Sequence, residues 1–172
     1  AVKTPGKNIF PYIQKNLDDI ITVPDEELVV AFLDIVENHK MVVENSGLLT
    51  VAALKHLNVQ NQRVVSILSG GNMDIITMSS VVQQGLIFRD RIFTVSVLLP
   101  DKPGMLSKVA DVIAKENGNV IKLEHNQFVS INRSAAVELR ITLETFGTEH
   151  KNQIIKALEE KGYQPKQVRT NI

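Results

Sequence analysis

The stretch IFTVSVLLPDKPGML, residues 92 to 106, decides the fold of the second half of the chain. Apolar side chains occupy every second position of residues 93–99, which is the period of a β-strand with two different faces. The pattern stops at Asp101-Lys102-Pro103-Gly104, which favours a turn because proline presets its own φ and aspartate bonds to nearby backbone. Residues 106–113 then carry apolar side chains at helical spacing. The stretch therefore predicts a strand, a turn and a helix.

The remainder of the second half repeats this unit. The first helix is expected to end at Asn117-Gly118, where glycine can take the left-handed conformation that ends helices. Residues 119–128 have an extended, mixed pattern, and residues 135–144 alternate between apolar and polar side chains, which predicts an antiparallel sheet with one solvated face. A second helical pattern over residues 154–158 and a last strand over residues 164–169 follow. The order βαββαβ predicts a ferredoxin-like sandwich with both helices on one face of the sheet.

The first half of the chain has a different pattern. Apolar residues at helical spacing predict a helix over residues 25–39 and a shorter helical stretch over residues 49–57. Residues 64–68 are nearly all apolar, which is typical of a strand covered on both faces in a parallel sheet. This half is therefore predicted to be α/β, and the charged residues Arg89-Asp90-Arg91 mark the start of the second half.

The composition argues against several kinds of partner. The 172 residues hold 19 basic and 19 acidic side chains, and a net charge of zero gives no field that attracts nucleic acid or an acidic membrane. The chain has no cysteine, which suits a reducing compartment, so we expect a cytoplasmic location. No apolar run is long enough for a membrane span, and the first residues lack the pattern of a signal peptide. The four histidines show no metal-binding spacing, so no metal site is expected.

The predicted strand over residues 64–68 leads into Ser69-Gly70-Gly71-Asn72. A hydroxyl at the end of a strand can donate a hydrogen bond to a ligand, and glycine lets a ligand approach the backbone closely. A strand followed by Ser-Gly-Gly-Asn is also an ordinary turn. These residues alone leave both a binding site and a simple turn open.

The turn at Asp101-Lys102-Pro103-Gly104 has the chemistry of a site for a free amino acid. It precedes a predicted helix, where unpaired backbone N–H groups and the positive end of the helix dipole favour a carboxylate. Asp101 can accept a hydrogen bond from an ammonium group, and Gly104 carries no side chain that would block the ligand. The same residues also suit a purely structural turn, so both alternatives stay open.

Several segments together resemble a known family. The D-x-P-G-x-L pattern of residues 101–106, inside βαββαβ, is similar to the loop of the ACT domain, a small regulatory module that binds amino acids. The start AVKTPG (residues 1–6), ENSG (residues 44–47) and LSGGN (residues 68–72) extend the resemblance to nearly the whole chain. The chain looks like the C-terminal portion of a pyridoxal-phosphate-dependent threonine dehydratase, or threonine ammonia-lyase. It departs from that family at Asn45, where a small residue or proline is usual.

The resemblance implies a chain of two parts. Residues 1–88 would be the C-terminal part of a fold-type II catalytic domain that depends on pyridoxal phosphate, and residues 89–172 would be an ACT regulatory domain. In that family the Schiff-base lysine and the phosphate-binding loop lie upstream. No lysine of the first half has the matching context; these are Lys3, Lys7, Lys15, Lys40 and Lys55. We therefore expect the parent enzyme to use pyridoxal phosphate, and this chain alone to be inactive and to bind none.

The resemblance also assigns site residues, none of them catalytic. The cofactor-binding residues would be Ser69, Gly70 and Glu44, with the Ser69 hydroxyl at the ring nitrogen of pyridoxal phosphate, where a hydroxyl suits β-elimination. A small amino-acid effector would lie between ACT domains of a homo-oligomer, at least a dimer. The effector-binding residues would be Asp101, Gly104, Met105 and Asn119.

The parent reaction implied by the resemblance is the elimination of water from L-threonine to give 2-oxobutanoate and ammonia, as in isoleucine biosynthesis. L-Serine is an alternative substrate, and the sequence fixes neither the effector nor whether it activates or inhibits. A different hypothesis is a non-enzymatic, amino-acid-sensing ACT regulator that acts on a separate partner and uses the first 88 residues as a scaffold. A lysine-bearing cofactor domain upstream would decide between the two.

Overall fold

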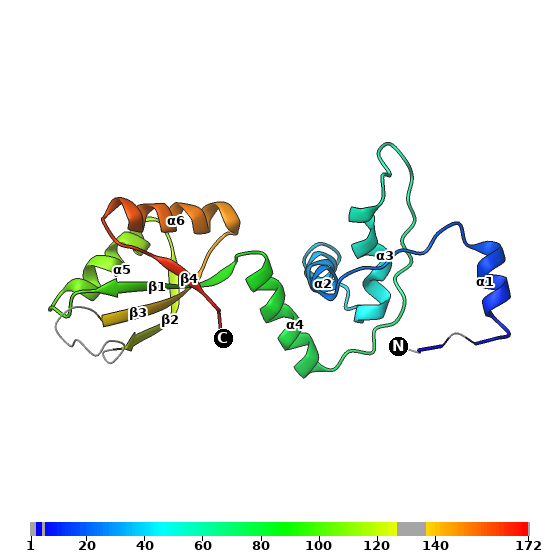
Figure 1. Cartoon of the computed structure of the whole chain (residues 1–172), viewed down its shortest axis with the longest axis horizontal. Helices are drawn as coiled ribbons and strands as arrows, with labels where there is room; N and C mark the ends of the chain where they lie inside the picture. The colour runs from blue at the N-terminus through cyan, green and yellow to red at the C-terminus, as the bar shows by residue number, and fades with distance from the viewer. Residues whose placement is uncertain (1–2, 5, 127–136, 172) are drawn as a thin grey trace.

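The computed structural model describes residues 3–4, 6–126 and 137–171, and it has two parts of different architecture (Figure 1). The first part is helical, and the second is a sheet with helices on one face. None of the helices in the described ranges combines the length and the apolar composition needed to cross a membrane. Parts of two predicted strands, residues 127–128 and 135–136, lie outside the described residues.

The second part has the predicted order βαββαβ. Its antiparallel strands lie in the order β2-β3-β1-β4, and helices α5 and α6 lie together on one face (Figure 1). The predicted ferredoxin-like arrangement is thus confirmed. The elements are β1 (Ile92–Leu99), α5 (Met105–Lys115), β2 (Asn119–Asn126), β3 (Val137–Glu144), α6 (Thr148–Glu160) and β4 (Lys166–Val168).

The core of this part lies between the sheet and the two helices. Alternate residues of β1 and β3 face α5 and α6, as the period of the sequence predicts. Their burial removes most of the apolar surface of both strands from water, which is the main favourable term in folding. The most deeply buried members are Val95, Val97, Val109, Leu139, Leu143, Ile154 and Leu158.

The opposite face of the sheet is less solvated than predicted. Glu138 and Thr142, expected to point into water, are only 9% and 4% exposed. Ser96 of β1 donates to the Glu138 carboxylate at 2.6 Å, and the hydroxyls of Thr94 and Thr142 lie 2.9 Å apart. The register of β1 against β3 creates these contacts, and each satisfies a buried polar group.

The turn after α5 differs from the prediction in one residue. Asn117, and not Gly118, takes the left-handed conformation, with φ of 60°. Gly118 is required for a different reason, because a Cβ there would lie 2.8 Å from Cγ2 of Ile113 and 2.9 Å from Cδ1 of Ile154. The glycine therefore allows close packing between α5 and α6, and the asparagine, which tolerates positive φ, makes the turn.

The first part consists of helices. Helix α2 spans Asp25–His39, as predicted, and its apolar face packs against α4 and the segment around Leu48. Helix α4 was not predicted; its N-cap is Asp74, whose carboxylate accepts from the Thr77 backbone N–H at 2.9 Å. The elements of this part are α1 (Phe10–Asn16), α2, η1 (Asn45–Leu48), α3 (Leu49–Ala52), η2 (Ala53–His56) and α4 (Ile75–Phe88).

The parallel strand predicted over residues 64–68 is not formed. The segment is extended, but no strand of the described ranges pairs with it, and Val65 and Ile67 are 88% and 70% exposed. A parallel strand needs neighbours for its backbone hydrogen bonds, and the described residues of this part supply helices alone. The first part is therefore helical here, and not α/β as predicted.

Candidate functional site

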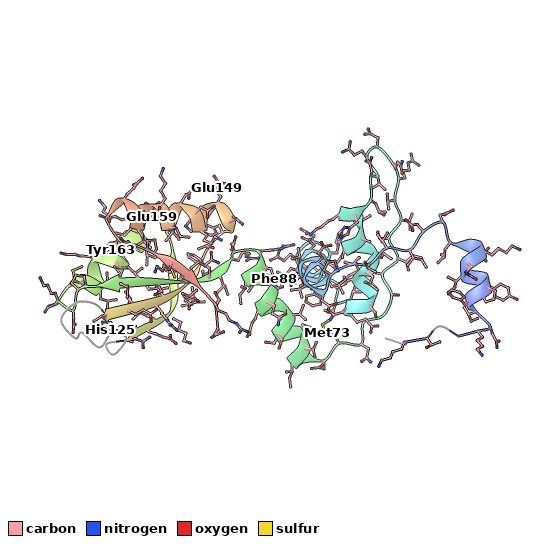
Figure 2. All side chains as sticks on the ribbon, in the orientation of Figure 1. Met73, Phe88, His125, Glu149, Glu159 and Tyr163 are labelled. Atoms are coloured by element: carbon pink, nitrogen blue, oxygen red, sulfur yellow. The ribbon has the colours of Figure 1, made fainter. Side chains whose placement is uncertain are left out.

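The loop between β1 and α5 forms one wall of a pocket in the second part. The pocket has a volume of about 330 Å³, within the range of small-molecule sites. Its other wall comes from the sheet, at the end remote from α4, where Figure 2 labels His125. The lining consists of loop residues 100–106 together with Leu99, His125, Val137 and Leu139.

Gly104 sets the shape of this loop. Its φ of 84° lies in the left-handed region that favours glycine, and it forms the N-cap of α5. The Met105 backbone N–H donates to the Lys102 carbonyl at 3.3 Å, which closes the loop on itself. A Cβ at Gly104 would meet no atom of the described residues within 4 Å. Among the described residues, glycine is therefore needed at position 104 for its positive φ, and not to avoid a steric clash.

The pocket combines charged and apolar groups. Asp101 and Lys102 are exposed on the loop, so each offers one of the opposite charges that a free amino acid requires. Leu99, Val137 and Leu139 supply an apolar floor. The arrangement can hold a small zwitterion with an aliphatic side chain.

His125 is a pocket residue that the sequence did not indicate. It lies opposite Leu139 in the β2–β3 register, which places both residues on the face that carries the pocket. The mixed pattern of residues 119–128 gave no signal for which face each side chain occupies. Only the pairing of β2 with β3 shows that His125 lies on the face that carries the pocket.

Asn119 lies at the other end of β2. It pairs with Glu144, and its Nδ2 donates to the Glu144 carboxylate at 3.0 Å. The chain thus brings Asp101, Gly104 and Met105 to the pocket and leaves Asn119 away from it. Since Asn119 was expected to act across a subunit interface, its role stays a prediction about an oligomer.

The residues predicted to face a cofactor also come together. The Glu44 backbone N–H donates to the Gly70 carbonyl at 3.3 Å. The Glu44 carboxylate accepts from the Ser46 hydroxyl at 2.7 Å and from the Asn72 backbone N–H at 3.0 Å. These hydrogen bonds, from Ser46 first and then Asn72, hold the pKa of the Glu44 carboxyl below its usual range. Glu44 therefore ties residues 69–72 to residues 44–47 as a carboxylate.

Glycines make this close contact possible. A Cβ at Gly47 would lie 1.8 Å from the Ser69 carbonyl oxygen, and a Cβ at Gly70 would lie 2.6 Å from Cδ of Glu44. Gly70 also has a φ of 77°. The two glycines thus serve packing between two segments of the chain, whereas the Ser69 side chain is exposed.

The described residues contain no group of three or more histidine, aspartate or glutamate side chains arranged to hold a metal ion. The buried His150 has both ring nitrogens occupied by backbone groups. Its Nδ1 accepts from the Phe146 N–H at 3.1 Å, and its Nε2 lies 2.6 Å from the Glu116 carbonyl, to which it donates. This histidine therefore joins α5 to the start of α6.

The second part of the chain is an ACT domain. Residues 93–162 match the family model described as "ACT domain", and the match begins in β1 and ends just after α6. The loop pocket and the strands β2 and β3 described above belong to this matched segment, and β4 follows it.

Comparison over nearly the whole chain gives the wider relationship. The chain is 36% identical over 165 residues to the L-threonine ammonia-lyase of Geobacter sulfurreducens and 31% identical over 165 residues to that of Thermotoga maritima. Each match covers 95% of this chain and 41% of the relative. The L-threonine dehydratase biosynthetic IlvA of Pasteurella multocida is 31% identical over 169 residues, 95% of this chain and 31% of that protein. The chain is homologous to the C-terminal part of the threonine ammonia-lyases, including an ACT domain, and spans less than half of their length.

Proposed function

We propose that this chain is the regulatory end of a threonine ammonia-lyase, in which the ACT domain binds a small amino acid and thereby changes the activity of the whole enzyme. The observation that carries the proposal is the loop pocket, which places Asp101, Lys102 and the start of α5 around an apolar floor. Relatives over 95% of the chain are L-threonine ammonia-lyases, which supports the parent reaction.

The pocket suggests how the effector is held. Its ammonium group donates to the Asp101 carboxylate, and its carboxylate accepts from backbone N–H groups in the first turn of α5. Lys102 adds a positive charge on the carboxylate side. The aliphatic side chain of the effector lies on Leu99 and Leu139. Asn119 would contribute from a second subunit of a homo-oligomer.

Calorimetric titration of the chain with L-isoleucine and L-valine tests this proposal. Binding heat is expected for at least one of them, and Asp101→Ala should weaken binding by roughly 10- to 100-fold, because a charge-assisted hydrogen bond is lost. Asp111→Ala is the matched control, since Asp111 is an exposed acid on α5 outside the pocket. Absence of heat with every amino acid tested would leave the ACT domain a structural module.

The first 88 residues are proposed to complete a catalytic domain that depends on pyridoxal phosphate. Bound there, the cofactor would supply an electron sink for the elimination. The exposed Ser69 fits a role at the ring nitrogen, because the hydrogen bonds that tie its turn to residues 44–47 leave its hydroxyl out. Glu44 fits a supporting role, because its carboxylate is engaged by Ser46 and Asn72 and holds the turn that carries Ser69.

The role of Ser69 is tested in the full-length parent enzyme. Ser69→Ala is expected to cut turnover sharply with a modest loss of bound cofactor, since the hydroxyl acts on the ring and the cofactor is held elsewhere. Ser80→Ala is the control, because the Ser80 hydroxyl donates to the Ile76 carbonyl within α4 and lies outside the cofactor-binding residues proposed above. Unchanged turnover in Ser69→Ala would contradict the assignment. The present chain is expected to retain no pyridoxal phosphate after dialysis, because no lysine of its first half has the family's context.

A further inference from the structure

Three consecutive charged residues, Arg89, Asp90 and Arg91, join the helical part to the ACT domain. Their side chains contact opposite sides of the junction: the two arginines contact α2, and the aspartate contacts α6. Figure 2 labels Phe88 at the end of α4 and Glu149 at the near end of α6, on either side of this junction. We call these three residues the charged clasp.

The arginines of the clasp bind one face of α2. Arg89 Nη2 donates to the Val30 carbonyl at 3.2 Å and pairs with Asp34, and Arg89 Nη1 lies 3.2 Å from Oε2 of Glu37. Arg91 pairs with the other oxygen of the Glu37 carboxylate. Glu37 thus bridges both arginines, which fixes them against the last turns of the helix.

Asp90 binds α6 with both oxygens of its carboxylate. Oδ1 accepts from Nζ of Lys151 at 2.8 Å, and Oδ2 accepts from the Thr148 hydroxyl at 2.8 Å. The side chains of Lys151 and Asp90 are only 12% and 19% exposed, so water screens this pair less than a surface pair. Asp90 has a φ of 53°, a conformation that aspartate tolerates better than most residues.

The backbone of the clasp leaves no free linker between the two parts. The Arg91 N–H donates to the Leu86 carbonyl in the last turn of α4 at 2.8 Å. The Arg91 carbonyl accepts from the Thr145 N–H, at the end of β3, at 2.8 Å. β1 begins at the next residue, so α4, β1 and β3 meet at Arg91.

We propose that the charged clasp holds α2 and the ACT domain together as one cooperative unit. A ligand that binds in the loop pocket then also stabilises α2. β1 provides the physical connection, since it runs without interruption from the clasp to Leu99 in the pocket wall (Figure 1). The transmission step rests on the proposed effector binding, whereas the mechanical union of the two parts does not.

Hydrogen exchange at increasing urea concentration tests the union without any ligand. In the unaltered chain, the amides of α2 and α6 are expected to lose protection at the same urea concentration, as one cooperative unit. Asp90→Asn keeps a side chain that tolerates positive φ but removes the charge that holds Lys151, so the two helices should open at different urea concentrations. Lys151→Met removes the same ion pair by replacing the lysine instead of the aspartate.

Glu160→Gln is the matched control for this experiment. It removes the partner of Lys156 in an exposed ion pair on the same helix, so it changes the charge of α6 by one without touching the clasp. In Glu160→Gln, the amides of α2 and α6 should still lose protection at the same urea concentration. The proposal is overturned if α2 and α6 already open separately in the unaltered chain, or still open together in both Asp90→Asn and Lys151→Met.

The transmission step is tested by exchange with L-isoleucine present. In the unaltered chain, the ligand should slow exchange in the loop of residues 100–106 and also in α2, whereas in Asp90→Asn only the loop should slow. Slowing of the loop without α2 in the unaltered chain would overturn transmission. If no amino acid slows the loop, the proposed effector site fails, and the ligand-free experiment still decides the union of the two parts.

Discussion

Glu138 shows how one residue can differ from the face on which its sequence pattern places it. Alternation along β3 predicts a solvated carboxylate, yet the side chain is buried and accepts from the Ser96 hydroxyl. The Ser96 hydroxyl is the largest influence that holds the pKa of Glu138 below its usual range, and Arg140 acts in the same direction. The partner on β1 is 42 residues away in sequence, so a local pattern cannot reveal it.

The lowered pKa predicts how stability depends on pH. Because the folded state has the lower pKa, Glu138 stabilises the fold above the unfolded-state pKa, and that contribution is lost as the pH falls from about 5 toward 3. Glu138→Gln should therefore reduce the free energy of unfolding by about 1 kcal/mol at pH 7 and by less at pH 3. Urea denaturation at pH 7, 5 and 3 measures this. An equal loss at all three pH values would contradict the explanation.

At the scale of elements, the contact between α2 and α4 depends on one glycine. A Cβ at Gly85 would lie 2.6 Å from Cδ1 of the buried Leu33. Alanine favours a helix over glycine by about 1 kcal/mol, but forcing a methyl group into a packed contact costs about 1 to 3 kcal/mol. Gly85→Ala is therefore expected to destabilise the chain, and Gln84→Ala, on the exposed side of α4, to change little. Thermal unfolding of both variants measures the difference, and a stabilised Gly85→Ala would show that Leu33 moves aside without cost.

The sequence predicts elements well where one period dominates. The amphipathic pattern predicted a helix over about residues 25–39, where α2 lies, and the alternation along β3 predicted the antiparallel sheet. Helix α4 was missed because it is apolar on most sides and rich in β-branched residues, although its Asp74–Thr77 cap was readable. The strand predicted over residues 64–68 was wrong. An apolar run indicates that a segment is buried, but it does not identify the segment that would bury it, and the apolar side chains are exposed here.

In the candidate site too, the residues that follow a local pattern were predicted, and those that depend on contacts between distant segments were not. The loop of residues 101–106 was found because its turn chemistry is local, and Glu44 and Gly70 were chosen by resemblance and do lie in contact. His125 was missed, since its place depends on pairing with Leu139 across two strands. The reason for Gly47, whose missing side chain lets the Ser69 carbonyl approach, depends on a contact between distant segments that no local pattern encodes.

For the whole molecule, the exposed apolar side chains within residues 64–67 favour self-association of the chain in isolation. Val65 is 88% exposed, and a net charge of zero provides no general repulsion between copies. Val65→Lys should therefore reduce self-association and leave the free energy of unfolding nearly unchanged, because the side chain makes few contacts. Sedimentation velocity over a range of concentrations measures the association.

Gln62→Lys separates the effect of charge from that of the apolar side chain. It adds the same charge at a nearby exposed position but keeps Val65. Equal reductions in association would mean that charge alone is responsible. A larger effect of Val65→Lys would show that the exposed apolar side chain drives the association.

The close contact between Gly85 and Leu33 also limits how α4 can move against α2. If α4 slid or turned by one residue, Gln84 or Leu86 would have to occupy a space that now holds only a hydrogen atom. Rotation or sliding of α4 along α2 is therefore costly. A rearrangement that starts in the ACT domain is expected to move α4 and α2 together, with the hinge outside the contact between these two helices.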